Sequence, residues 1–151
     1  MACKDRSSGI LLHVSALPGP CGIGTAGPEA EAWADGLRAM GQAWWQVLPL
    51  CPTSYGDSPY QSPSTFAGNP LFISLDRLVE DGLLPRAERD RQMRPAGVPV
   101  DYGALLQDRA PLWDGLTARF DRRASSALRR RFDRFCDEAG EWLETYALYE
   151  A

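Results

Sequence analysis

Residues 9–14 read GILLHV and residues 44–48 read WWQVL. Each is a short apolar run with a Gly or Pro at one boundary, which is typical of a buried strand in a parallel sheet. Between them, residues 28–40 place apolar side chains at helical spacing, with Pro28 in the first turn and Gly41 as a C-terminal stop. The order strand, helix, strand predicts one βαβ unit and an α/β fold.

The turn after the first strand contains the glycine pattern GIGTAG at residues 22–27, which matches the G-x-G-x-x-G fingerprint of dinucleotide-binding folds. Two features argue against a nucleotide site. Residues 17–20, LPGP, separate the glycines from the strand, and residues 49–52, PLCP, stand where a ribose-binding Asp or Glu is expected. We therefore predict that the glycines shape a tight strand-to-helix turn, and a nucleotide-binding regulator is the disfavoured alternative.

The remainder of the chain divides into a long loop, a short mixed segment and a helical region. Residues 50–70 show neither helical nor strand period, and long irregular loops in compact domains are usually functional or disordered. Residues 71–75 are predicted to form a third short strand and residues 76–84 a short helix. Residues 86–99, rich in Arg and Pro, are predicted to be an exposed connection, and the helical pattern begins at Asp101.

Apolar residues in the helical region recur at alternating spacings of four and three, which predicts one continuous apolar face. They are Leu128, Phe132, Phe135, Ala139, Trp142, Tyr146 and Tyr149. This face is expected to pack against the rest of the parent domain, with a cofactor or partner helix as the alternative. No Gly, Asn or Pro closes the pattern before Ala151, so we expect the chain to be truncated there.

Charge and composition argue against several classes of partner. The formal net charge of −4 gives no electrostatic reason to expect nucleic acid or an anionic membrane surface. The arginines of residues 119–134 lie among Asp residues on predicted helices, which favours a solvated helix surface over a nucleic-acid patch. The apolar run of residues 10–12 is too short for a signal-peptide core or a membrane span, so we expect a cytoplasmic protein.

The cysteines and the histidine offer little for metal or redox chemistry. Cys3, Cys21, Cys51 and Cys136 are widely spaced and are expected to be reduced thiols. His13 is the single histidine, and we expect no zinc site. It lies at the end of the first strand, where a structural role is expected and an active-site role is the alternative.

The informative stretch is YGDSPYQS at residues 55–62, inside the long loop. Proteins bind sugars with aromatic faces, which cover the apolar C–H surface of a pyranose, and with fixed polar groups that meet its hydroxyls. Two tyrosines with Asp, Ser and Gln between or beside them supply both parts. The stretch also follows a strand, which is where barrel enzymes carry their sites. A well-packed Tyr/Ser/Pro loop without a ligand is the alternative.

Several ordered segments together resemble the amylomaltase family, the 4-alpha-glucanotransferases or disproportionating enzymes of the α-amylase superfamily. These segments are LLHVSALPGP (11–20), GIG (22–24), WQVLPL (45–50) and YGDSPYQSPSTFAGNP (55–70). The resemblance is close over residues 8–84. It continues more loosely through VDYG (100–103) and WLETYAL (142–148).

The resemblance implies the N-terminal portion of a (β/α)8 TIM-type barrel with an inserted helical subdomain. Residues 1–84 would be the first βαβ portion of the catalytic barrel, with a glucan-binding loop at 50–70, and residues 85–151 a helical insertion truncated at 151. The family transfers α-1,4-glucan segments to a sugar 4-hydroxyl with retention of configuration, using an Asp nucleophile and a Glu acid/base. These carboxylates would lie beyond residue 151, and no metal or organic cofactor is implied.

By resemblance, Tyr60 matches the tyrosine that stacks on the sugar at the cleavage site, and Ser58 matches a residue that contacts the donor chain. Tyr55 matches an aromatic of a secondary glucan-binding site, although the partner aromatic of that site would align near Leu106, which is not aromatic. Asp57 and Gln61 are expected only to shape the loop. The expected partners are α-1,4-glucans and maltooligosaccharides, and a non-catalytic α-glucan-binding module is the alternative. Because a single βαβ unit leaves sheet edges uncovered, the chain is predicted to fold poorly alone.

Overall fold

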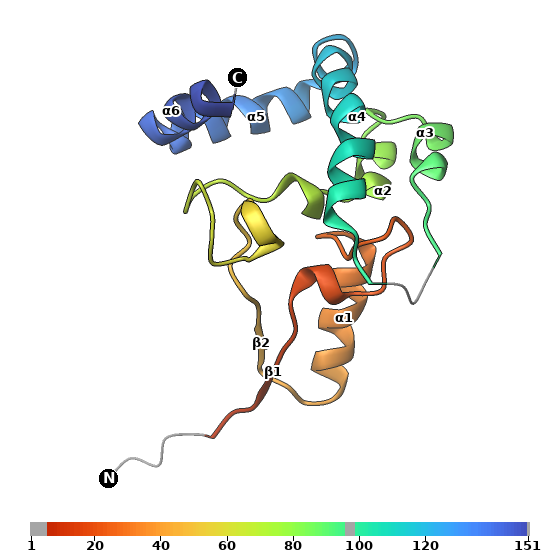
Figure 1. The fold of residues 1–151 in the computed structure, drawn as a ribbon, viewed down its shortest axis with the longest axis vertical. Helices are drawn as coiled ribbons and strands as arrows, with labels where there is room; N and C mark the ends of the chain where they lie inside the picture. Colours follow the sequence, from red (N-terminus) through yellow and green to blue (C-terminus); the bar gives the residue numbers. More distant parts are fainter. Residues whose placement is uncertain (1–5, 96–98, 151) are drawn as a thin grey trace.

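The computed structural model describes residues 6–95 and 99–150, with the backbone alone for Tyr55. Strands β1 (Gly9–Leu11) and β2 (Trp44–Gln46) pair in parallel, with Ile10 opposite Trp45, and helix α1 (Pro28–Ala39) connects them (Figure 1). The predicted βαβ unit is therefore confirmed. Both strands are shorter than predicted. The first ends early because the backbone turns after Leu12 into a 3-10 helix, η1 (Val14–Ala16).

The glycine-rich turn between β1 and α1 brings two backbone segments into direct contact. The Gly24 amide donates to the Ser15 carbonyl at 3.2 Å. A Cβ atom on Gly24 would lie 2.7 Å from the Leu17 Cβ and would also collide with the Val14 carbonyl. The glycines thus shape a tight strand-to-helix turn, as predicted.

Gly24→Ala is expected to lower the free energy of unfolding by about 1–3 kcal/mol, because the added methyl meets backbone that cannot move aside easily. Gly36→Ala is the matched control, since a Cβ there finds no atom within 4 Å. Inside helix α1 it is expected to stabilise by roughly 0.5–1 kcal/mol. Thermal unfolding of the product of the complete gene measures both. A Gly24→Ala protein as stable as the parent would contradict the close approach.

The segment predicted as a third strand is helical, and that prediction was wrong. The chain forms a 3-10 helix η3 (Pro70–Phe72) followed by helix α2 (Leu75–Glu80). The Asn69 side-chain oxygen accepts from the Leu71 amide at 2.9 Å, and the Ser74 hydroxyl accepts from the Arg77 amide at 3.4 Å. These two caps start successive helical turns where the apolar run alone suggested a strand.

The exposed connection predicted at 86–99 contains a helix, α3 (Arg86–Arg91), which is a second correction. Two ion pairs hold it against its neighbours. The Arg89 Nε atom donates to the Asp76 carboxylate at 2.8 Å, and the Arg119 Nη2 atom donates to the Glu88 carboxylate at 2.7 Å. Tertiary partners that are distant in sequence therefore stabilise a segment with no apolar period of its own.

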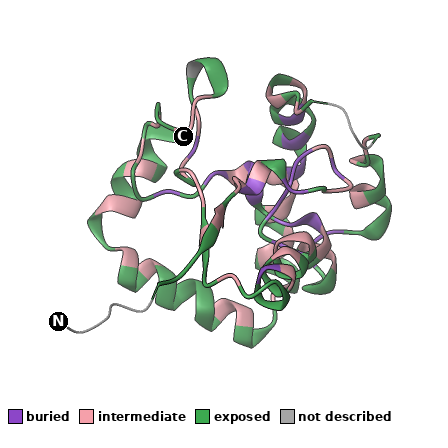
Figure 2. Cartoon of the chain, turned by 90° about the horizontal axis from the view of Figure 1, so that it is seen from below, coloured by how far each residue is buried: buried purple, intermediate pink, exposed green. Residues whose placement is uncertain are grey.

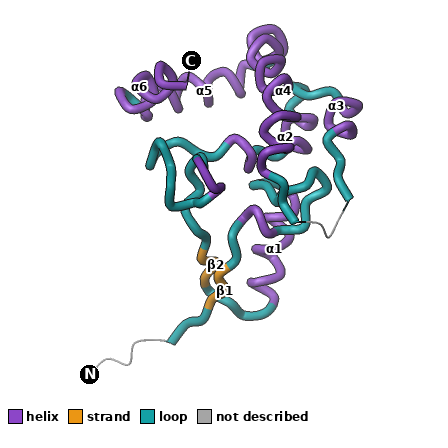
Figure 3. Tube along the Cα trace, in the orientation of Figure 1, coloured by secondary structure: helices purple, strands orange, loops and turns teal. Residues whose placement is uncertain are grey.

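The predicted helical region is confirmed as α4 (Tyr102–Arg123), α5 (Ser126–Ala139) and α6 (Glu141–Glu150). The continuous apolar face predicted across α5 and α6 is interrupted, however. Gly140 has φ = +61°, a value that favours glycine, and it separates the two helices. Figures 1 and 3 show α5 and α6 at the end of the molecule opposite the strands, beside the 50–70 loop.

The core lies where α4 meets η3, α2 and the turn between β1 and α1. One cluster of buried side chains contains Val14, Leu17, Ile23, Leu71, Phe72 and Leu105, and a second contains Cys21, Leu75, Leu84 and Leu112. The two strands contribute no buried residue, as Figure 2 shows, and Trp44 is 66% exposed. None of the helices in the described ranges is both long and apolar enough to cross a membrane.

Candidate functional site

Hydrogen bonds close the 50–70 loop at two places, at its base and around an inner turn. At its base, the Asn69 amide donates to the Leu50 carbonyl at 2.8 Å. Further out, the amide and the hydroxyl of Ser54 both donate to the Gln61 carbonyl, each at 3.0 Å. Residues 54–61 therefore form an inner turn whose ends are fixed, and this turn carries most of the stretch that the sequence predicts to bind a sugar.

Left-handed backbone at two consecutive residues reverses the chain inside this turn. Gly56 has φ = +79° and Asp57 has φ = +55°, within the 3-10 helix η2 (Tyr55–Asp57). Asp tolerates this conformation better than most residues because its short polar side chain can bond locally. The Asp57 amide donates to the Ser54 carbonyl at 3.1 Å. Asp57 thus takes part in shaping the loop, the role expected for it.

Two of the three candidate site residues lie together at the tip of the loop. Tyr60 is 73% exposed, so its ring face is open to a ligand. Ser58 is half-buried, and its hydroxyl accepts from the Tyr60 amide at 3.3 Å. The side chain of Tyr55 lies outside the described part of the structure. Leu106, near which the resemblance would put the partner of Tyr55, is 48% exposed on α4.

His13 packs against the core. Its ring meets Phe72 edge-on, with centroids 5.3 Å apart and an interplanar angle of 79°. The Nδ1 atom is buried and finds no hydrogen-bond partner among the described residues. Burial lowers the pKa of His13, because the charged imidazolium loses hydration there. These contacts agree with the structural role expected at a strand end.

The lowered pKa of His13 predicts a loss of stability in mild acid. Below about pH 6.5 the unfolded chain takes up a proton that the folded protein resists, so stability falls as the pH drops from there toward the folded pKa. In a proton NMR titration, the imidazole resonance that disappears in His13→Gln should titrate below pH 6.5. A midpoint at or above that value would contradict the burial of this ring.

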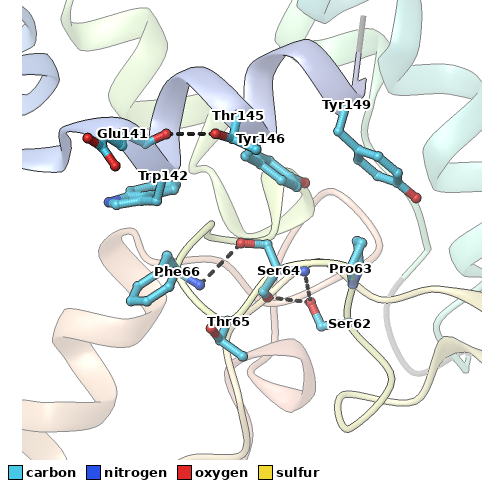
Figure 4. A pocket seen from close by; sticks show the side chains of 10 residues that line it. All are labelled: Ser62, Pro63, Ser64, Thr65, Phe66, Glu141, Trp142, Thr145, Tyr146 and Tyr149. Atoms are coloured by element: carbon cyan, nitrogen blue, oxygen red, sulfur yellow. Dashed lines mark hydrogen bonds between the residues drawn. The ribbon is translucent and has the colours of Figure 1, made fainter.

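A groove between the loop and α6 was not predicted from the sequence. It has a volume of about 670 Å³ and is lined by residues 62–66 of the loop and by Glu141, Trp142, Thr145, Tyr146 and Tyr149 of α6 (Figure 4). We call it the aromatic groove. The Trp142 and Phe66 rings stack across it, with centroids 5.7 Å apart and an interplanar angle of 26°. The spacing of the α6 aromatics indicated a packing face, but Phe66, the partner of Trp142, is distant in sequence.

The loop and the groove offer surfaces for stacking and for hydrogen bonds to hydroxyls. Asp57 is the one carboxylate within residues 50–70. Over residues 6–95 and 99–150, no cluster of three or more His, Cys, Asp or Glu side chains could hold a metal ion. Cys21, Cys51 and Cys136 are free thiols. Chemically, the exposed ring of Tyr60 can stack on an apolar ligand face, and the Ser58 hydroxyl can hydrogen-bond to a ligand oxygen.

Comparisons with known proteins all find 4-alpha-glucanotransferases, and the matches cover nearly the whole chain. A family model described as 4-alpha-glucanotransferase matches residues 12–151. The 4-alpha-glucanotransferase of Streptococcus pneumoniae is 43% identical over 149 residues, which cover 98% of this chain and 29% of that protein. The enzyme of the same name from Thermus thermophilus is 43% identical over 149 residues, covering 97% of this chain and 28% of that protein.

Among solved structures, amylomaltase from Streptococcus agalactiae in complex with acarbose superposes with a TM-score of 0.79 at 38% identity. The superposition covers 89% of this chain and 27% of that one. The chain thus spans less than a third of the length of the relatives described. On the family match and these relatives together, the chain belongs to the 4-alpha-glucanotransferase family.

Proposed function

We propose that this chain is the N-terminal, donor-binding portion of a 4-alpha-glucanotransferase. The whole enzyme would transfer α-1,4-glucan segments to the 4-hydroxyl of another sugar with retention of configuration. The observation that carries the proposal is the closed 54–61 turn, which presents Tyr60 with an open ring face beside the Ser58 hydroxyl. The relative solved in complex with acarbose supports an oligosaccharide as the ligand.

Tyr60 would stack on the donor sugar at the cleavage site. A ring face covers the C–H surface of a pyranose, and its negative quadrupole favours positive charge developing at the anomeric carbon. Ser58 would contact the same sugar chain. Its oxygen already accepts from the Tyr60 amide, so its proton is available for a sugar oxygen. Tyr55 would contribute one aromatic face to a secondary glucan site, where Leu106 supplies no second ring.

The bond-breaking carboxylates would come from outside this chain. Retaining glycosidases place a nucleophile and an acid/base about 5–5.5 Å apart, and Asp57 belongs to the loop-shaping motif instead. We place residues 1–84 in the first βαβ portion of a (β/α)8 barrel, with the glucan-binding loop at 50–70, and residues 85–151 in a helical insertion. The parallel β1–β2 pair with its uncovered strands supports that arrangement.

A non-catalytic α-glucan-binding module is the second candidate. The observation in its favour is that the loop is closed by its own hydrogen bonds, from Asn69 to Leu50 and from Ser54 to Gln61. Such a module would bind amylose without changing it.

Product analysis after incubation of the complete gene product with maltotriose tests the proposal. A glucanotransferase releases glucose and forms a ladder of longer maltooligosaccharides. Glucose and maltose alone would indicate hydrolysis and contradict the transfer reaction. Unchanged maltotriose, together with retention on an amylose column, would favour the binding module.

A further inference from the structure

We propose that Ser54 is a positioning residue for the transfer reaction, because its hydroxyl fixes the turn that presents Tyr60 to the donor sugar. The inference rests on the proposed function for the role of Tyr60. Ser54 would act through the backbone of the 54–61 turn and not on the sugar itself. The contacts that carry the inference all lie within this turn, so they do not depend on any surface outside it.

Ser54 uses all three of its hydrogen-bonding groups to hold the turn. Its amide and its hydroxyl both donate to the Gln61 carbonyl, each at 3.0 Å. Its carbonyl accepts from the Asp57 amide at 3.1 Å, across the left-handed reversal at Gly56 and Asp57. A carbonyl oxygen has two lone pairs, and Ser54 provides a donor for each of them. One residue therefore joins the start of the turn to its reversal and to its end.

Tyr60 lies between two residues whose backbone or side chain is fixed by these contacts. On one side, the Tyr60 amide donates to the Ser58 hydroxyl at 3.3 Å. On the other side, Gln61 is held at both of its backbone groups, since its amide donates to the Ser58 carbonyl at 3.1 Å and its carbonyl accepts from Ser54. The direction in which Tyr60 leaves the backbone is thus set by Ser58 and Ser54.

The exposure of Tyr60 makes the backbone decisive for its position. The residue is 73% exposed, so side-chain packing contributes little to holding the ring. Without the Ser54 hydroxyl, the Gln61 carbonyl would keep only the Ser54 amide as a donor within the turn, and the turn would open more often. A ring that is in place for only part of the time lowers the effective affinity for the sugar by that fraction. Fixing the turn in advance avoids this loss.

Ser54→Ala in the complete gene product is expected to lower kcat/KM for maltotriose about fivefold, the effect of losing one hydrogen bond between neutral groups. Ser54→Thr keeps the hydroxyl and should restore most of the activity, since Ser54 is exposed and leaves room for a methyl group. Ser62→Ala is the matched control. It removes a hydroxyl that donates to the Ser64 carbonyl at 2.6 Å in the same loop but outside the turn, and it should leave turnover unchanged.

A double-mutant cycle with Tyr60 tests whether Ser54 acts through that ring. In a Tyr60→Ala protein there is no ring left to position, so adding Ser54→Ala should lower kcat/KM by less than about twofold. The same fivefold loss in both backgrounds would overturn the positioning role, because Ser54 would then act independently of Tyr60.

Thermal unfolding separates positioning from a general effect on the fold. Ser54 is exposed, so the midpoint for Ser54→Ala should stay within about 2 °C of the parent. A much lower midpoint, together with lost turnover, would assign Ser54 to the stability of the fold and overturn the inference.

The maltotriose reaction also distinguishes this inference from the proposed function. If the parent forms no ladder of products, the proposed transfer activity fails, and the role of Ser54 fails with it. If the parent forms the ladder and Ser54→Ala turns over maltotriose like the parent, the positioning role alone fails.

Discussion

Arg109→Ala is expected to lower the free energy of unfolding by about 3–5 kcal/mol. Arg109 is fully buried on α4, with 0% exposure. Its Nη1 atom donates to the Leu71 carbonyl at 2.8 Å, and its Nη2 atom donates to the Cys21 carbonyl at 3.2 Å. The guanidinium thereby joins α4 to both the glycine-rich turn and η3. Truncation would leave two buried carbonyls without a donor and a cavity between the three segments.

The size of the effect depends on how the cavity is filled. Burial lowers the pKa of Arg109, because the charged guanidinium loses hydration there. Replacing a buried charge by an apolar side chain of similar volume can recover stability. Arg109→Met should therefore destabilise less than Arg109→Ala, while still leaving the carbonyls of Leu71 and Cys21 unpaired.

Thermal unfolding of the complete gene product, followed by tryptophan fluorescence, measures both variants. Arg122→Ala is the matched control, because Arg122 is exposed on the same helix. Its stability should stay within about 0.5 kcal/mol of the parent. Equal midpoints for Arg109→Ala and Arg122→Ala would show that Arg109 does not hold the core as the contacts indicate.

Tyr60→Ala is expected to reduce kcat/KM for maltotriose about 30-fold, which corresponds to roughly 2 kcal/mol of lost transition-state stabilisation. The reason is the loss of the aromatic face that would cover the donor sugar. Tyr60→Phe keeps this face and should retain most of the activity. Tyr60 is 73% exposed, so neither change should disturb the fold.

Phe66→Ala is the control for Tyr60→Ala. Both residues are exposed aromatics of the same loop, but Phe66 lines the aromatic groove and not the 54–61 turn. Its removal should leave turnover of maltotriose unchanged.

If Tyr60→Phe loses as much activity as Tyr60→Ala, the hydroxyl and not the ring face carries the interaction.

The βαβ unit could be predicted because its signals are local. Apolar runs mark both strands, and Pro28 and Gly41 mark the helix ends. The helical turns at 70–80 could not be predicted from the apolar run, because the side chains of Asn69 and Ser74 decide them. The break between α5 and α6 at Gly140 was not predicted for a different reason. The apolar spacing of α5 continues in phase across it into α6, so the pattern conceals the break.

The candidate site was predictable only in part. The closeness of Ser58 and Tyr60 follows from their spacing of two residues, and the residue types suggested a sugar. The closure of the loop depends on contacts from Ser54 to Gln61 and from Leu50 to Asn69, which no local pattern encodes. The aromatic groove depends on Phe66 meeting Trp142 across the fold. Sequence periodicity identifies such a face without identifying its partner.

Incubating residues 1–151 and the complete gene product side by side with maltotriose tests the central claim most directly. We expect the complete product to form glucose and a ladder of maltooligosaccharides, and residues 1–151 alone to leave maltotriose unchanged, since the chain would supply donor binding without the catalytic carboxylates. A ladder of products from residues 1–151 alone would place catalysis within this chain and contradict the account.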